Sequence, residues 1–214
     1  MSKTPFLIRR FVVAALLLPL AVVSTVLLGR GWMLKFQSEN LRTLPVYQEV
    51  VPFHLISQKG EAFTRESLAG KIWIADFIFT RCAGPCPVMT NHLKEIAARL
   101  PEADMRFISF SVDPDYDVPE RLSSYAEKFG ADTQRWTFLT GDKLTIRGLS
   151  MQNFYLGVSE VPEAEREAPD QVVTHSTKFV LVDRLGRIRG YYDGMDPESL
   201  KLLVKDAGVL LRNS

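Results

Sequence analysis

The sequence lacks an excess of charge of either sign, because 26 basic residues balance 25 acidic ones to a net charge of +1. Four of the basic residues (Lys3, Arg9, Arg10 and Arg30) fall in the first 30 positions, where no acid occurs, so residues 31–214 carry a net charge of −3. A domain with this charge lacks the excess of basic residues that nucleic-acid-binding proteins carry, so nucleic-acid binding is excluded as its function. The chain has no internal repeat, and its length and 46% hydrophobic content suffice for one substantial core.

Charged residues are also absent from residues 11–29, a run of 19 positions. At about 1.5 Å per residue, a helix of this length crosses a hydrocarbon core of about 30 Å. The preceding basic residues predict that residues 1–10 stay in the cytoplasm and that the rest is exported. We therefore expect a transmembrane anchor at 11–29, a linker at 30–45 and a folded domain at 46–214.

A cleaved signal peptide is the alternative interpretation of the apolar run. The run is long for a signal peptide, and no small-x-small cleavage site precedes Arg30, so the sequence favours an uncleaved anchor. No cysteine lies near the end of the run to carry a lipid. The first ten residues lack the arginine- and serine-rich character of a mitochondrial transit peptide, which favours a bacterial inner membrane with the domain in the periplasm.

Cysteine is scarce, and both cysteines, Cys82 and Cys86, fall in one short stretch. An apolar, β-prone run ends at Thr80, residues 83–85 suit a turn, and Pro87 suits the first position of a helix. Cys86 is then expected at a helix N-terminus, which favours thiolate over thiol. Two buried, unreactive cysteines or a structural disulfide are the alternatives. In an exported domain, the pair must be kept reduced, bind a metal or be cycled.

The pattern of apolar residues predicts an α/β sandwich with a central mixed sheet and an N-terminal hairpin. Two cysteines at the first strand-to-helix corner make the thioredoxin-like fold the natural candidate. A loop as long as the one expected at Tyr155–Val173 is usually functional. The expected elements are a hairpin (Val51–Ile56 and Glu61–Phe63), strands at Ile72–Phe79, Met105–Val112 and Trp136–Leu139, helices at Val88–Leu100, Pro119–Phe129 and Asp142–Phe154, a second hairpin (Lys178–Val182 and Arg187–Tyr192) and a last helix at Asp196–Gly208.

Histidine is scarce as well, with three in the chain. His54 falls in the first hairpin and His92 on another face of the helix after Cys86, so neither is expected as a ligand. His175 lies just before the strand whose entry loop, in a thioredoxin-like sheet, packs over the cysteine corner. Thiol oxidoreductases of this fold have a cis-proline there, whereas between Glu165 and Pro197 this chain has only Pro169, which comes too early.

Two thiolates and one imidazole form a soft set of donors that suits Cu(I), and that can hold Cu(II) with an additional ligand. Zinc in a closed structural site would need a fourth donor, and none is evident. Cys82 and Cys86 could equally share a metal or close a disulfide. His175 could instead be a buried histidine whose ring is hydrogen-bonded to backbone groups.

Three ordered motifs resemble the Sco/SenC family of membrane-anchored copper proteins, over Val51 to the C-terminus. They are Thr80-x-Cys82-x-x-x-Cys86-Pro87, Ser111-Val112-Asp113-Pro114-x-x-Asp117-x-Pro119, and His175-Ser176 before Phe179-Val180-Leu181-Val182-Asp183. The resemblance implies a thioredoxin-like domain that binds one copper ion through Cys82, Cys86 and His175. It also implies a role in assembling the dinuclear copper centre of cytochrome c oxidase, by delivering copper or by reducing that centre's cysteines. Asp113 would then orient ligands or contact the partner, or only cap its turn.

The sequence departs from the family between its cysteines, where it has Ala83-Gly84-Pro85 in place of a proline and an acid after the first cysteine. Gly-Pro-Cys resembles thioredoxin. The rival hypothesis is therefore an extracytoplasmic thiol-disulfide oxidoreductase with Cys82 or Cys86 as nucleophile and incidental copper binding. A peroxidase of the same superfamily is disfavoured, because both cysteines lie at one corner. We expect a metallochaperone whose partner is the copper-bearing oxidase subunit or another copper or thiol protein.

Overall fold

The computed structural model describes residues 23–33, 43–161 and 173–212, and the chain divides into two compact units between Thr43 and Leu44. Residues 23–33 of the first unit form a helix. Residues 11–22 of the predicted anchor lie outside the described residues. Within the part of the chain that is described, no helix combines the length and the apolar character that a membrane crossing requires.

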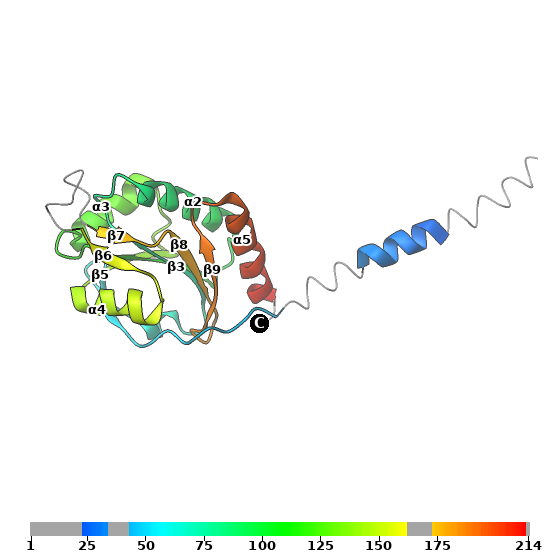
Figure 1. Ribbon diagram of the computed structural model, residues 1–214, viewed down its shortest axis with the longest axis horizontal. Coiled ribbons are helices and arrows are strands. Elements are labelled where there is room, and N and C mark those ends of the chain that lie inside the picture. Colours follow the sequence, from blue (N-terminus) through cyan, green and yellow to red (C-terminus); the bar gives the residue numbers. More distant parts are fainter. Residues whose placement is uncertain (1–22, 34–42, 162–172, 213–214) are drawn as a thin grey trace, which may run out of the picture. The chain divides into compact units, whose positions relative to one another are not determined.

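The second unit is built on a mixed sheet, which in the described residues has seven strands in the order β2-β1-β5-β4-β3-β8-β9 (Figure 1). β3, β4 and β5 run parallel, and the other pairs in this sheet are antiparallel. A separate pair, β6 and β7, lies outside this sheet. The strands are β1 (His54–Ser57), β2 (Ala62–Thr64), β3 (Ile72–Ile78), β4 (Met105–Ser111), β5 (Trp136–Thr140), β6 (Val158–Glu160), β7 (Val173–His175), β8 (Lys178–Val182) and β9 (Ile188–Asp193).

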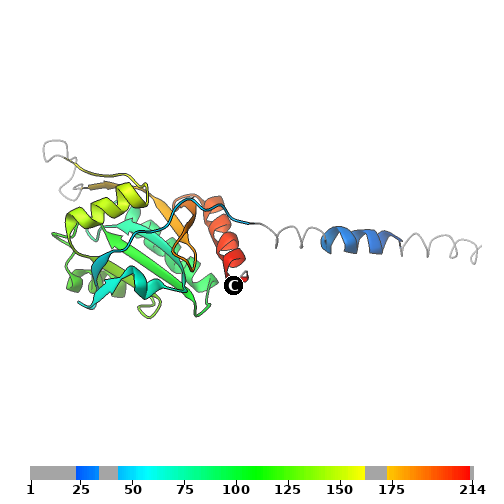
Figure 2. The same cartoon turned by 90° about the horizontal axis from the view of Figure 1, so that it is seen from below.

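Helices cover both faces of this sheet (Figures 1 and 2). The helices α2 (Pro85–Arg99) and α3 (Pro119–Phe129) connect the parallel strands, and right-handed crossovers place both on the same face. On the opposite face lies α4 (Lys143–Gly148), which continues as a π-helical stretch at Leu149–Asn153. The C-terminal helix α5 (Pro197–Arg212) packs against β9 and α2.

The central strand β3 organises the core, and all seven of its residues are buried. On the α4 face, Phe77 stacks on Phe110 with ring centroids 5.0 Å apart, and Phe154 packs edge-on against Phe77. Because successive strand residues point to opposite faces, the buried Asp76 faces the helix that carries the cysteines. The apolar character of this strand on both faces correctly predicted its central position.

The outer edge of β9 is covered by residues 44–50, here called the N-terminal strap. Backbone hydrogen bonds run from Tyr47 N to Ile188 O (3.0 Å) and from Ile188 N to Gln48 O (2.7 Å). The guanidinium group of Arg189 donates to the carbonyl oxygens of Leu44 and Pro45. The strap therefore occupies backbone groups that an exposed edge strand would otherwise present to other chains.

Two elements differ from the sequence-based expectation. The helix after the cysteines begins at Pro85, not after Pro87, because either proline suits a first helical position and the earlier one takes it. The stretch Tyr155–Val173, expected as one loop, contains β6 and the first residue of β7, which pair antiparallel.

Candidate metal centre

The two cysteines lie at the carboxyl end of β3, on either side of the start of α2. The Cys82 N–H donates to Phe79 O at 3.2 Å, which closes a turn directly after the strand. Gly84 follows closely, since a Cβ atom at that position would lie 3.8 Å from the Cys82 sulfur. Cys82 is partly exposed, whereas Cys86 falls in the first turn of α2 and is completely buried. A reagent or partner therefore reaches Cys82 first.

The Cys86 thiol does not have the low pKa that its predicted position suggested. A hydrogen bond with Cys82 raises the pKa of Cys86, and burial and the nearby charge of Cys82 raise it further. The negative charge of Asp76 acts in the same direction. The expectation of a thiolate at Cys86 is thus wrong for the reduced, metal-free pair, because the side chain points into the core and toward a second sulfur.

Contacts to α3 fix the turn that carries Cys86. The Thr90 hydroxyl donates to the Cys86 carbonyl oxygen at 2.8 Å, and the Tyr125 hydroxyl lies 2.8 Å from the same Thr90 oxygen. Since the Thr90 proton is used by Cys86, Tyr125 is the donor to Thr90. Burial raises the pKa of Tyr125, which keeps that donor protonated.

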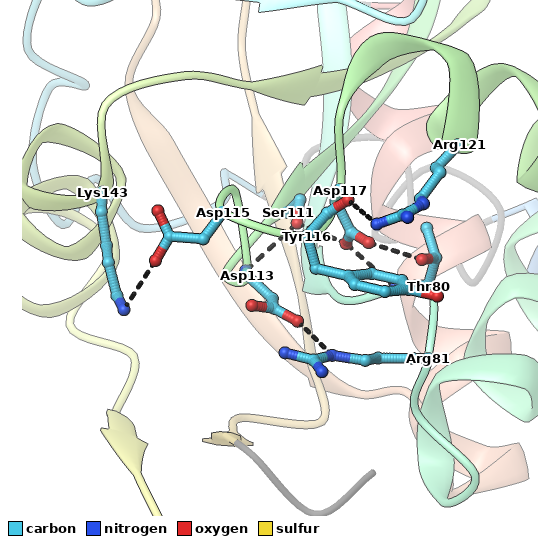
Figure 3. A network of polar contacts seen from close by, with 9 residues as sticks. All are labelled: Thr80, Arg81, Ser111, Asp113, Asp115, Tyr116, Asp117, Arg121 and Lys143. Atoms are coloured by element: carbon cyan, nitrogen blue, oxygen red, sulfur yellow. Dashed lines mark hydrogen bonds and ion pairs between the residues drawn. The ribbon is translucent and has the colours of Figure 1, made fainter.

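The two residues before Cys82, Thr80 and Arg81, are held by a different element, the turn between β4 and α3 (Figure 3). The carboxylate of Asp117 accepts hydrogen bonds from the Thr80 N–H (3.0 Å), the Thr80 hydroxyl and the Ser111 hydroxyl (2.6 Å). Asp117 is fully buried, and this burial raises its pKa despite the three donors. The segment that leads into Cys82 is therefore held by a buried acid 37 positions along the chain.

Asp113, predicted to lie near the site, contacts the residue directly before Cys82. Its carboxylate accepts from Arg81 Nε at 2.6 Å, and its side chain is only 8% exposed against 34% for Arg81. The hydrogen bond to Asp113 raises the pKa of Arg81, so the guanidinium group stays charged. Sequence analysis missed Arg81 and the contact of Asp117 with Thr80, although all three residues lie within or beside the motifs it used.

His175 is the last residue of β7, where it pairs with Val158. Its side chain lies outside what the structure describes, so only the course of the backbone bears on its role. Two residues later, Thr177 O accepts the Gly194 N–H at 2.8 Å. A Cβ atom on Gly194 would lie 3.3 Å from the Met89 side chain in α2. The backbone at Thr177 and Gly194 therefore lies close to the helix that carries Cys86.

The other two histidines lie elsewhere. His54 is exposed on β1, and His92 Nδ1 lies 2.8 Å from Gly194 O, a contact that joins α2 to the β9–α5 connection. In the described residues, no group of three or more His, Cys, Asp or Glu side chains could hold a metal. The two cysteine sulfurs, which are not disulfide-bonded, are soft donors that fit Cu(I).

Comparisons with known proteins point to one family. The SCO1/SenC family model matches residues 43–205. The chain is 36% identical over 165 residues to the SCO1 protein homolog of Bacillus subtilis (strain 168), and this similarity covers 76% of the chain and 82% of the relative.

Two solved structures extend the similarity to the fold. BsSco, described as a member of the Sco family of cytochrome c oxidase assembly proteins with a disulfide switch, is 33% identical with a TM-score of 0.66, over 79% of this chain and 96% of BsSco. Bradyrhizobium japonicum ScoI, solved with copper bound, is 26% identical with a TM-score of 0.62, over 74% of this chain and 99% of ScoI. The predicted thioredoxin-like fold with a central mixed sheet is confirmed.

Proposed function

The chain belongs to the SCO1/SenC family, and on that premise we propose that it is a copper-binding protein of cytochrome c oxidase assembly. It delivers copper to the dinuclear copper site of the oxidase, or reduces the cysteines of that site. The observation that carries this proposal is the pair of sulfurs at one corner, Cys82 partly exposed and Cys86 buried beside it. An exposed and a buried sulfur together allow copper to be held and still be reached by an acceptor.

We assign Cys82, Cys86 and His175 as the copper ligands. Two sulfurs and one imidazole suit Cu(I), and Cu(II) is held when a further ligand is added. The assignment of His175 is supported by the position of Thr177, two residues further on. Thr177 O accepts a hydrogen bond from Gly194, and Gly194 packs against Met89 of α2, the helix that carries Cys86. The turn that contains Asp113 and Asp117 positions Thr80 and Arg81, the two residues directly before Cys82.

A copper titration tests the ligand set. The reduced full-length chain, kept anaerobic, should take up one Cu(I) ion in competition with a chromophoric chelator. Cys82→Ser and Cys86→Ser should abolish tight binding of Cu(I). His175→Ala should weaken the Cu(I) affinity by at least about tenfold, because losing a residue that only hydrogen-bonds to a metal ligand already costs about that much. His54→Ala is the matched control, since that side chain is exposed on β1 and should leave affinity unchanged. Wild-type affinity in His175→Ala would remove His175 from the ligand set.

A second function is favoured by the same pair of sulfurs. An accessible thiol beside a buried one is the arrangement of an attacking and a resolving cysteine in thiol-disulfide exchange. The rival is therefore a thiol-disulfide oxidoreductase in which copper is incidental. Rapid turnover of a protein disulfide, with no copper in protein isolated from copper-replete cells, would favour this rival over the copper carrier.

We propose that residues 11–29 anchor the chain in a bacterial inner membrane, with residues 1–10 in the cytoplasm and the copper-binding domain in the periplasm. The uncharged run and the basic residues before it support this topology. In the periplasm the cysteines meet an oxidising environment. Oxidation of the pair to a disulfide removes both sulfur ligands, so copper binding requires the reduced form.

A further inference from the structure

Arg81, the residue directly before Cys82, stacks on a tyrosine that lies between two arginines. The ring of Tyr116 has the Arg81 guanidinium carbon 4.5 Å from its centroid and the Arg121 guanidinium carbon 3.7 Å from it. Figure 3 shows the two guanidinium groups on opposite faces of the ring. Such stacking holds each arginine by cation–π attraction and leaves the N–H groups at its edge available for hydrogen bonds.

Among the described residues, most of these N–H groups have no acceptor. Arg81 uses Nε for Asp113, and Arg121 uses Nη1 for the carbonyl oxygen of Tyr116. The other N–H groups of both side chains make no hydrogen bond to the described residues. A guanidinium group has five N–H donors in a fixed planar arrangement, which matches the two oxygens of a carboxylate.

None of the three aspartates of this turn pairs with Arg121 in the described residues. Asp113 is paired with Arg81, and Asp115 is paired with Lys143 at 3.1 Å. Asp117 is buried and turned toward Thr80 and Ser111. Arg121 is exposed and forms no ion pair within the described part of the chain, so its guanidinium group is open to an acid of another protein.

We propose that Arg121 and the outer N–H groups of Arg81 bind a carboxylate-bearing segment of the partner protein, next to the cysteines that this partner presents to Cys82. The inference rests on the proposed function and names the chemistry of its partner. Tyr116 fixes the orientation of both arginines, so little side-chain freedom is lost on docking. The docked partner then has its own sulfur positioned against Cys82.

For a partner in its disulfide form, the exchange can be written in full. The Cys82 thiolate attacks one partner sulfur, which forms a mixed disulfide and releases the other partner sulfur as a thiolate. Cys86, after losing its proton, attacks Cys82 and releases the second partner thiolate. The protein dithiol is oxidised to the Cys82–Cys86 disulfide, the partner disulfide is reduced to two thiols, and the two protons pass to the partner.

Three synthetic peptides test the docking site. They contain the same disulfide loop flanked by two glutamates, two glutamines or two lysines, and each is mixed with the reduced full-length chain while the mixed disulfide and the released thiol are followed. The glutamate peptide should react about threefold to tenfold faster than the lysine peptide at low salt. The difference should vanish at about 1 M salt, where the screening length is about 3 Å.

Arg121→Gln should lower the rate with the glutamate peptide about threefold to tenfold and leave the rate with the glutamine peptide unchanged. Tyr116→Leu should have a smaller effect in the same direction, because both arginines lose the ring that orients them. Arg99→Gln is the matched control, since it removes an exposed arginine at the opposite end of α2 and should change none of the rates.

Two outcomes would overturn the docking site: equal rates of the wild-type chain with all three peptides at low salt, or an equal loss of rate with all three in Arg121→Gln, which indicates a structural role. The copper titration separates this test from the proposed function. A chain that binds no copper but prefers the glutamate peptide retains the docking site and loses the copper-carrier assignment.

Discussion

At the scale of single residues, the two cysteines are positioned independently. Cys86 is fixed within α2, where Thr90 and Tyr125 hold its carbonyl group. Cys82 is held through Thr80, whose N–H and hydroxyl both donate to Asp117. One sulfur is therefore held within the helix α2, and the other follows a residue that is held by the turn after the neighbouring strand β4. Their separation depends on how β3 and β4 are joined at their carboxyl ends.

Asp117→Ala should test whether the β4–α3 turn positions Cys82. It leaves the buried Ser111 hydroxyl and the partly buried Thr80 donors without their acceptor, and we expect a loss of about 1–3 kcal/mol for the buried group, as measured by urea unfolding. The Cu(I) affinity should fall in parallel, because Cys82 loses its fixed position. Asp115→Ala, an exposed position on the same turn, should stay within about 0.5 kcal/mol of the wild type. Wild-type copper affinity in a destabilised Asp117→Ala chain would show that this turn does not position Cys82.

At the scale of secondary structure, the sequence predicted what depends on local pattern. The apolar run at 72–79 gave β3, the polar turns gave both hairpins, and the proline after the second hairpin gave the start of α5. The start of α2 was misplaced by three residues, at Val88 instead of Pro85, because two prolines compete for the first helical position. The burial of Cys86 was missed because it depends on how α2 rotates against the sheet.

Contacts between distant elements were beyond sequence reasoning. The motifs contain both Thr80 and Asp117, but no periodicity brings positions 37 residues apart into contact. The stack of Arg81, Tyr116 and Arg121 likewise forms only when the β3–α2 and β4–α3 connections lie side by side. These contacts follow from the parallel pairing of β3 with β4, which places both strand ends at one edge.

The β8–β9 hairpin is fastened to the N-terminal strap by one buried acid. Asp183 is 5% exposed and pairs with Arg187 and with Arg189, which also binds the strap. Burial alone would raise the pKa of Asp183, but hydrogen bonds from Arg187, from Arg189 and from backbone N–H groups lower it below its ordinary value. An acid with a lowered folded-state pKa stabilises the fold above its unfolded pKa of about 4, and this stabilisation is lost as the pH falls through the folded value.

Asp183→Asn should therefore remove part of the acid sensitivity of the domain. We expect a loss of about 1.5–3 kcal/mol at pH 7, the range for hydrogen bonds to charged groups. The difference in melting temperature from the wild type should narrow below about pH 4. Glu198→Gln, which removes an exposed surface pair, should follow the wild type at every pH. A difference that stays constant from pH 7 to pH 3 would contradict this account of the hairpin.

At the scale of the whole chain, the N-terminal run and the domain should behave as separate units. The full-length chain is expected in the membrane fraction after a carbonate wash, and a chain that begins at Thr43 in the soluble fraction, because the 19 uncharged residues are absent from it. Mass spectrometry of the protein from membranes should find the N-terminus intact. A mature chain that begins near Arg30 would instead identify a cleaved signal peptide.

The backbone contacts of the strap lie at the opposite end of the sheet from the cysteines. Trp73 pairs with Val182 and Val182 with Ile188, so the strap joins the sheet at the end where β3 begins, while Cys82 follows the other end. From Trp73 to Phe79 the strand advances about 20 Å at about 3.3 Å per residue. The backbone contacts of the strap with Ile188 and the cysteines are therefore separated by about 20 Å along the strand direction. An acceptor that reaches Cys82 therefore approaches the end of the sheet away from these strap contacts.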